Sequence, residues 1–196
     1  MKQAVLRLAT LGLIVGRIAS AHATTIDFQA YATGTALTSL DGITFSLVGG
    51  PDSAGSPLIG YDDIPPRGLS NSTNPNYPTA NILDFSFSAP VSGVSFYFNN
   101  YGDNGTSYYE AFNSAGTRLE SGNVSSDLGY ANVVLTASGI KDLQFNNGYP
   151  SSESWYFVVP SITFSMSAVP EPSSWSLLAL GFAGLGFVGS RRARAG

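Results

Sequence analysis

The sequence contains no cysteine, a single histidine at position 22, and charged residues at only 11% of its positions. Without cysteine the chain forms no disulfide and builds no thiolate zinc site. A Ser-His-Asp triad or a zinc–histidine centre would depend on His22 alone. The chemistry left open is that of carboxylates: paired acids for glycoside hydrolysis, or oxygen ligands for calcium.

The N-terminal segment, residues 1–23, has the pattern of a secretory signal peptide. Two basic residues precede a short apolar run, and Ala21 and Ala23 form an A-x-A-like cleavage site. Cleavage after Ala23 would start the mature chain at Thr24. It would also remove His22, so the mature protein would have neither histidine nor cysteine.

The charge that remains is strongly acidic. Between residues 24 and 169 only Arg67, Arg118 and Lys141 are basic, against twelve acidic residues, which gives a net charge of −9. Nucleic-acid binding needs a basic surface, so we expect no nucleic-acid partner. The length of this region suits one domain with its own core.

The run at residues 173–190 contains no charged residue. As a helix it would be about 27 Å long, at about 1.5 Å per residue. The hydrocarbon core of a bilayer is about 30 Å thick, a difference that local thinning accommodates. A buried core helix is the alternative, but the run has no polar face and four glycines, which favours a membrane. Arg191, Arg192 and Arg194 then predict a basic cytoplasmic tail at residues 191–196.

Val-Pro-Glu-Pro at residues 169–172 comes directly before this run. The order of motif, apolar helix and arginine cluster over residues 169–196 resembles the PEP-CTERM sorting signal of Gram-negative bacteria. The resemblance implies recognition of Pro170, Glu171 and Pro172 by an exosortase-type membrane processing enzyme. It also implies sorting to the surface or into an extracellular polysaccharide matrix. The two prolines keep helix out of the motif, which leaves it open to such an enzyme.

The region 24–168 consists of short alternating runs separated by Gly, Asn, Ser and Pro, which predicts an all-β domain. The clearest strands are 83–87 and 94–98, and we expect residues 90–93 to join them as a tight hairpin. Pro160 predicts a bulge or a bend in the last strands. Nine or ten strands at this spacing predict a single antiparallel β-sandwich of jelly-roll type. Their rhythm resembles the galactose-binding-like domains common among PEP-CTERM proteins.

The stretch 49–80 departs from this rhythm, with six prolines and five glycines in 32 residues. Loops of this length are uncommon, so we expect either a mobile loop or a ligand-binding loop. Asp62 and Asp63 within it, and Asp103 further on, are weak calcium candidates. Asx turns on a solvated surface explain the same residues more simply.

Two aromatic residues, Tyr109 and Trp155, are candidates for stacking on sugar rings, although burial in a core or an interface would explain them too. In a strand, Tyr108 and Tyr109 should point to opposite faces, so at most one of them belongs to any one platform.

Two functions fit these observations. The first is a non-catalytic exported protein of the surface or matrix, held in the inner membrane in transit and binding exopolysaccharide. The second is a secreted carbohydrate-active enzyme, for which Glu110, Glu120 and Glu153 offer carboxylates without a spacing that selects a pair. Two acids about 5–9.5 Å apart in one groove would favour the enzyme.

Overall fold

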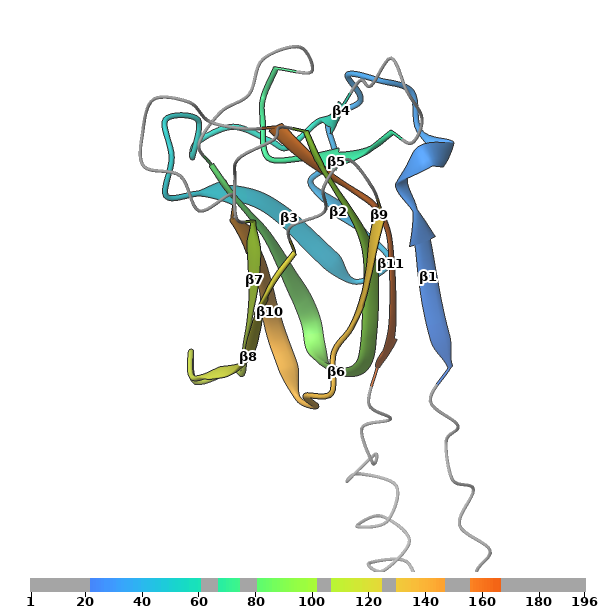
Figure 1. The fold of residues 1–196 in the computed structure, drawn as a ribbon, viewed down its shortest axis with the longest axis vertical. Helices are drawn as coiled ribbons and strands as arrows, with labels where there is room; N and C mark the ends of the chain where they lie inside the picture. Colours follow the sequence, from blue (N-terminus) through green and yellow to red (C-terminus); the bar gives the residue numbers. More distant parts are fainter. Residues whose placement is uncertain are drawn as a thin grey trace, which may run out of the picture. The chain divides into compact units, whose positions relative to one another are not determined.

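A computed structural model describes six segments of the chain, at residues 22–60, 67–74, 81–101, 107–124, 130–146 and 156–166. Within these segments the chain forms eleven strands and one short 3-10 helix (Figure 1). The strand pairs are antiparallel throughout. The predicted all-β antiparallel fold is confirmed.

The elements follow one another along the chain in this order: β1 (Ala23–Asp27), η1 (Phe28–Ala30), β2 (Ser39–Leu40), β3 (Ile43–Val48), β4 (Ile59–Gly60), β5 (Gly68–Ser70), β6 (Ile82–Tyr101), β7 (Tyr108–Phe112), β8 (Arg118–Asn123), β9 (Tyr130–Val134), β10 (Ile140–Asn146) and β11 (Tyr156–Met166).

The 20-residue strand β6 joins the two layers of the domain. Residues 82–87 pair with β3 on one side and β10 on the other. Residues 91–101 pair with β11 and β9. Each half of β6 therefore has a neighbouring strand on both of its edges, so the two halves of β6 cannot pair with each other. The predicted hairpin at 90–93 is wrong: the chain bends there, with Gly93 at a φ of 60°, and passes from one layer to the other.

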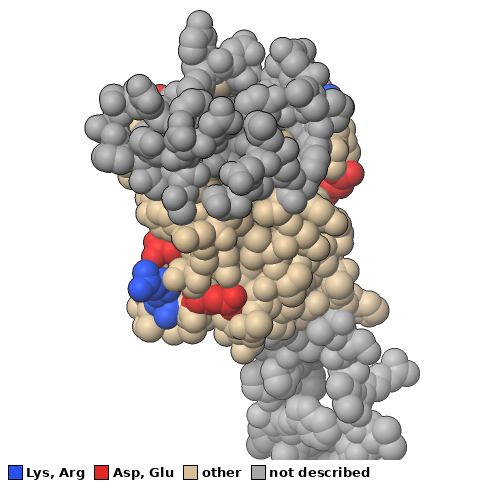
Figure 2. Space-filling view, in the orientation of Figure 1, with Lys and Arg blue, Asp and Glu red and all other residues tan. Residues whose placement is uncertain are grey.

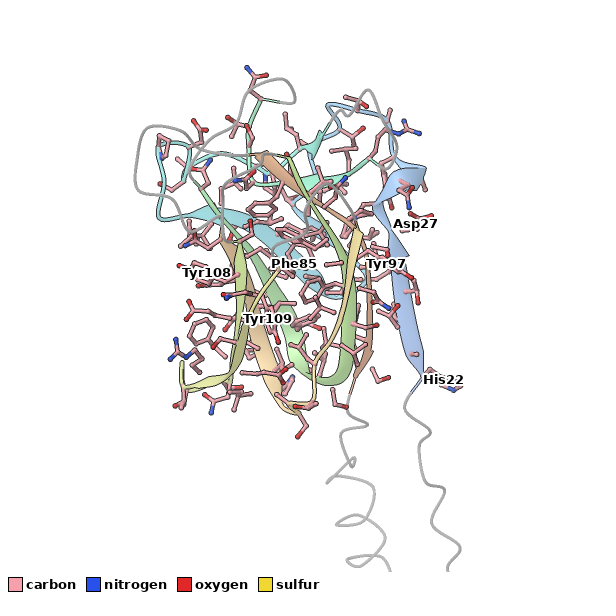
Figure 3. The ribbon with its side chains drawn as sticks, viewed as in Figure 1. His22, Asp27, Phe85, Tyr97, Tyr108 and Tyr109 are labelled. Atoms are coloured by element: carbon pink, nitrogen blue, oxygen red, sulfur yellow. The ribbon has the colours of Figure 1, made fainter. Side chains whose placement is uncertain are left out.

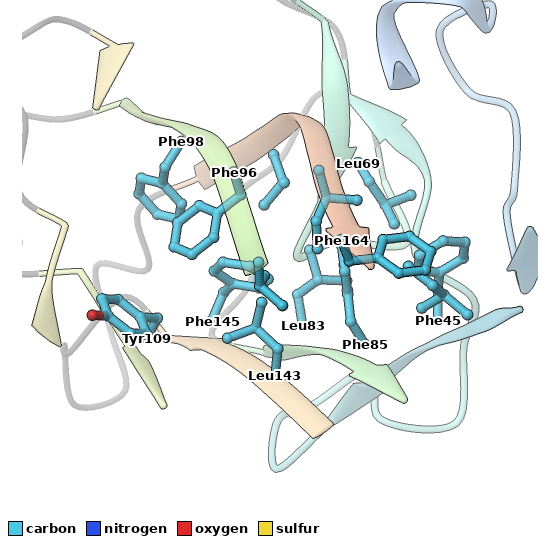
Figure 4. Packing of buried hydrophobic residues seen from close by; sticks show 14 of the residues in the cluster. Phe45, Leu69, Leu83, Phe85, Phe96, Phe98, Tyr109, Leu143, Phe145 and Phe164 are labelled. Carbon is cyan, nitrogen blue, oxygen red and sulfur yellow. The ribbon is translucent and has the colours of Figure 1, made fainter. Parts of the chain in front are cut away.

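Continuous hydrogen bonding through β6 makes one sheet that is folded over into a sandwich. We call the layer with β2, β3, the first half of β6, β10, β7 and β8 layer A. Layer B holds the second half of β6 with β9, β11, β1, β5 and β4. Aromatic rings meet between the layers: Phe96 of layer B lies 4.8 Å from Phe145 of layer A, and Phe87 lies 5.2 Å from Phe164 (Figure 4).

The stretch 49–80 is not the single long loop that the sequence predicts. Its described parts include β4 and β5, which extend layer B beside β11. Ile59 and Leu69 on these short strands are fully buried in the core. The sequence did not predict these strands, because each is only two or three residues long and shows no alternating pattern. The prolines and glycines around them are typical of loops.

The last strand, β11, pairs with both β6 and β1. Its register with β6 shifts between Val158 and Ser161, which confirms the bulge predicted at Pro160. On its other side β1 pairs with it from Ala23 to Asp27. The compact unit to which these strands belong spans Ala21–Ser167. No helix in the described part of the chain is long and apolar enough to cross a membrane, and the helix predicted at 173–190 lies outside that part.

Candidate functional site

The outer face of layer A carries a row of polar side chains at one register. Consecutive pairs across five strands place five residues in line: Ser46, Asp84, Gln144, Glu110 and Ser121. On β3, β6, β10 and β7 the neighbours of these residues along the strand are buried, and Ser121 on β8 is itself exposed, so the five side chains point outward. All five are partly or fully exposed. We call this row the polar stripe.

At one end of the polar stripe, strands β7 and β8 form an open recess of about 500 Å³. Six residues line it: Tyr108, Glu110, Arg118, Ser121, Gly122 and Asn123. Tyr108 and Tyr109 point to opposite faces, as the sequence predicted, with Tyr108 outward and Tyr109 in the core, and Figure 3 shows the two on opposite sides of β7. Tyr108 pairs across the strands with Asn146 on one side and Asn123 on the other.

The charges in this recess are already paired. Arg118 Nη1 lies 2.6 Å from Glu110 Oε1, with side chains 59% and 25% exposed. Figure 2 shows basic and acidic groups side by side at the left of the described surface, most of which is uncharged. A charge-assisted hydrogen bond of this length restricts both side chains.

Further along the polar stripe, burial raises the pKa of Asp84, and the charge of Asp142 raises it further. Hydrogen bonds from Gln144 and Ser46 act in the opposite direction without cancelling the effect. Its Oδ1 is buried and has no hydrogen-bond partner among the described residues. Burial of an ionised carboxylate costs free energy, which is why this pKa moves upward.

The structure separates the predicted candidates in this region. Tyr109 is 7% exposed and its ring meets Phe96 at 5.6 Å inside the core, so Tyr108 takes its place as the exposed aromatic. Glu120 pairs with Ala111 and faces inward, whereas Glu110 faces outward. Glu110 and Glu120 therefore lie on opposite faces and do not form an acid pair.

The remaining predicted candidates, apart from Ala23 at the start of β1, lie outside the described residues: Asp62, Asp63, Asp103, Glu153, Trp155, Ala21, Pro170, Glu171, Pro172, Arg191, Arg192 and Arg194. In the described segments no three acidic or histidine residues come together as a metal site.

Sequence reasoning missed the other members of this surface, above all Arg118 and Gln144. Alternation in β7 and β10 marks which residues point outward, and that signal was available. The register between β10, β7 and β8 was not, because it depends on pairs between residues that are as many as 38 positions apart, as Asn146 and Tyr108 are.

The fold and this surface define an antiparallel β-sandwich with a polar recess on one outer face. Residues 168–192 match the family described as the PEP-CTERM protein-sorting motif. The chain thus carries this sorting motif, which confirms the resemblance found in the sequence. Such a motif indicates an exported protein that passes through the membrane and is processed by exosortase. No curated protein matches the chain.

Several solved β-sandwich structures are similar to the chain at low identity. A family 29 carbohydrate-binding module is 12% identical, with a TM-score of 0.41 over 76% of this chain and 99% of that one. A family 6 carbohydrate-binding module is 17% identical, with a TM-score of 0.32 over 74% and 94%. The K1 cleaved adhesin domain of Lys-gingipain from Porphyromonas gingivalis is 12% identical, with a TM-score of 0.37 over 75% and 99%.

Proposed function

We propose that this protein is a non-catalytic, exported carbohydrate-binding protein of the cell surface or extracellular matrix. The observation that carries the proposal is the recess between β7 and β8. Tyr108 lines it together with Glu110, Arg118, Ser121 and Asn123, whose side chains carry a carboxylate, a guanidinium, a hydroxyl and an amide.

This combination suits a sugar because sugars are amphipathic. An aromatic ring offers an apolar face for the C–H groups of a pyranose, and a tyrosine keeps a polar tip at the water boundary. The surrounding groups include donors, acceptors and a hydroxyl that is both, which matches the mixed character of sugar hydroxyls. A mainly apolar ligand would leave the paired charges of Glu110 and Arg118 desolvated at a cost.

The sorting motif supports the proposed location. In this account a signal peptide at residues 1–23 is removed, and the C-terminal segment at 173–190 holds the protein in the inner membrane in transit. Exosortase then recognises Pro170–Glu171–Pro172 and releases the domain to the surface or matrix, where exopolysaccharide is the available ligand.

The recess is tested by two tyrosine variants that differ in their place on the sandwich. Tyr108→Ala removes the ring at the recess, and Tyr97→Ala removes a ring that is 46% exposed on the outer face of layer B. Both variants are compared with the wild-type domain on a glycan array and then by titration calorimetry with the glycans that bind. We expect Tyr108→Ala to weaken binding about tenfold or more and Tyr97→Ala to leave it unchanged.

If Tyr97→Ala weakened glycan binding and Tyr108→Ala did not, the carbohydrate site would lie on layer B. An array on which the wild-type domain binds no glycan would sink the proposal, because the recess would then have no carbohydrate ligand among the sugars presented.

One observation favours the alternative of a carbohydrate-active enzyme. Asp142 pairs with Ser86, two residues from Asp84, so the two acids are diagonal neighbours on the outer face. Diagonal neighbours lie about 7–8 Å apart, so their side chains can reach the separation of about 6.5–9.5 Å between the carboxyl groups of inverting glycosidases. Neither acid lines the recess, and this favours binding. Release of reducing ends from a bound polysaccharide, abolished by Asp142→Asn, would establish the enzyme instead.

A further inference from the structure

We propose that the recess is one end of a longer binding surface, the polar stripe, and that its ligand is an extended, uncharged polysaccharide chain lying across the strands. This inference rests on the proposed function and names the ligand class of that site. It starts from the register, which aligns one outward polar residue on each of five neighbouring strands.

The length of the polar stripe exceeds that of the recess. From Ser46 to Ser121 there are four strand spacings, and at about 4.8 Å each the stripe is about 19 Å long. The recess includes only its Glu110 and Ser121 end. A ligand confined to the recess would leave Gln144, Asp84 and Ser46 without a role, whereas a linear polymer would reach all five.

The chemistry of the stripe suits hydroxyl groups. Two members carry hydroxyls, one carries an amide that both donates and accepts, and two carry carboxylates that accept. Gln144 and Ser46 are the cross-strand partners of Asp84 within this set, so the three polar side chains lie next to one another on the outer face.

The charges on this face exclude an anionic polymer. Arg118 is held by Glu110 at 2.6 Å, and Lys141 Nζ donates to the backbone carbonyl of Phe87. Arg67, the other basic residue between positions 24 and 169, comes just before β5 in layer B. A uronic-acid chain on the stripe would therefore bring carboxylates next to acidic residues with no uncommitted cation, and like charges repel.

The test compares ligands of different length and charge on three variants of the whole exported domain. Gln144→Ala removes the middle of the stripe, and Ser46→Ala removes its far end. Asn132→Ala is the matched control, because Asn132 pairs with Tyr97 on layer B. Calorimetry with glucohexaose, mannohexaose, the corresponding disaccharides and alginate gives the affinities, and melting temperatures show that each variant is folded.

We expect Gln144→Ala and Ser46→Ala to bind the hexasaccharide that binds wild type about three- to tenfold more weakly, which is the effect of one hydrogen bond. The disaccharide should bind all variants equally, and alginate should not bind wild type. If Tyr108→Ala loses binding while both stripe variants bind every length as wild type does, the recess stands and the stripe is wrong. Binding of alginate, a polymer of uronic acids, to wild type would refute the proposal that the ligand is uncharged. Failure of every sugar would overturn the proposed function itself.

Discussion

Removal of the Glu120 carboxylate should destabilise the domain more than removal of the Glu110 carboxylate. Glu120 Oε2 accepts hydrogen bonds from the Thr136 backbone N–H at 2.9 Å, the Thr136 hydroxyl at 3.2 Å and the Ala137 N–H at 2.8 Å. Oε1 accepts from the Tyr109 hydroxyl at 3.1 Å. These bonds link β8, at the edge of layer A, to the connection between β9 and β10, and so close one side of the sandwich.

The magnitude follows from the number and exposure of these bonds. Buried hydrogen bonds to a charged group contribute about 1.5–3 kcal/mol each, and Glu120 is only partly buried, so we take about 0.5–1 kcal/mol for each of the four. Glu120→Ala should therefore cost about 2–4 kcal/mol. In a domain of this size 1 kcal/mol lowers Tm by about 2–4 °C, so the expected fall is about 4–16 °C. Glu120→Gln keeps an acceptor for the backbone N–H groups and should cost about half as much.

The pH dependence has a definite sign. Burial alone would raise the pKa of Glu120, but the hydrogen bonds from Ala137, Tyr109 and Thr136 outweigh it and the pKa is lowered. A lowered pKa in the fold means that the stabilisation is complete above the unfolded value of about 4.3. It is lost as the pH falls through the folded value. Burial, and after it the carboxylate of Glu120, raises the pKa of Tyr109 to about 12.

The assay is thermal unfolding of wild type, Glu120→Ala and Glu110→Ala between pH 7 and pH 3. Glu110 is the matched control, because its exposed ion pair with Arg118 should contribute about 0–1 kcal/mol. Equal losses for the two alanine variants at pH 7 would refute the reasoning. So would a Glu120→Ala effect that stays the same at pH 3, since the carboxylate would then not be its source.

Three further substitutions test other parts of the structure. Gly68→Ala should cost about 1–3 kcal/mol in urea unfolding, because its Cβ would lie 2.6 Å from the backbone carbonyl of Val159; an unchanged midpoint would contradict that close approach. Phe145→Ala should cost about 3–5 kcal/mol, since its ring meets Phe96 between the layers, and a loss below 1 kcal/mol would be inconsistent with that packing. Asp84→Asn should raise Tm by about 1–3 °C at pH 7 and by less at pH 4. The reason is that the pKa of Asp84 is raised in the fold, so its ionisation lowers stability as the pH rises. A lower Tm of the variant at pH 7 would show instead that the charge of Asp84 stabilises the domain.

Local patterns predicted the strands well and their partners poorly. The alternation of Leu83–Phe87 and Val94–Phe98 identified both halves of β6 and their buried faces. It did not show that the halves belong to different layers, because a proline–glycine bend serves a hairpin and a layer crossing equally well. That choice depends on β3, β10, β9 and β11, which occupy the edges of β6.

The site was less predictable than the fold for the same reason. The sequence identified aromatic residues and carboxylates as the relevant groups, and alternation correctly separated Tyr108 from Tyr109. The polar stripe is invisible in the sequence because its members come from five strands, and Ser46 and Ser121 are 75 positions apart. Only the register between strands brings them into one line.

The ends of the domain and the proposed binding surface occupy different parts of the sandwich. The first and last strands pair with each other, from Ala23 with Ser165 to Asp27 with Ser161. Cleavage after Ala23 would remove one of these five pairs and leave four, so β1 would keep its place in the sheet after maturation.

The sorting motif begins at residue 168, two positions after β11 ends. Along the sheet, β6, β10 and β7 separate β11 from β8. Along the sheet, β7 and β8 of the recess are therefore separated by two and three strands from the strand that leads into the sorting motif, so we expect processing at the motif to leave ligand binding at the recess unchanged.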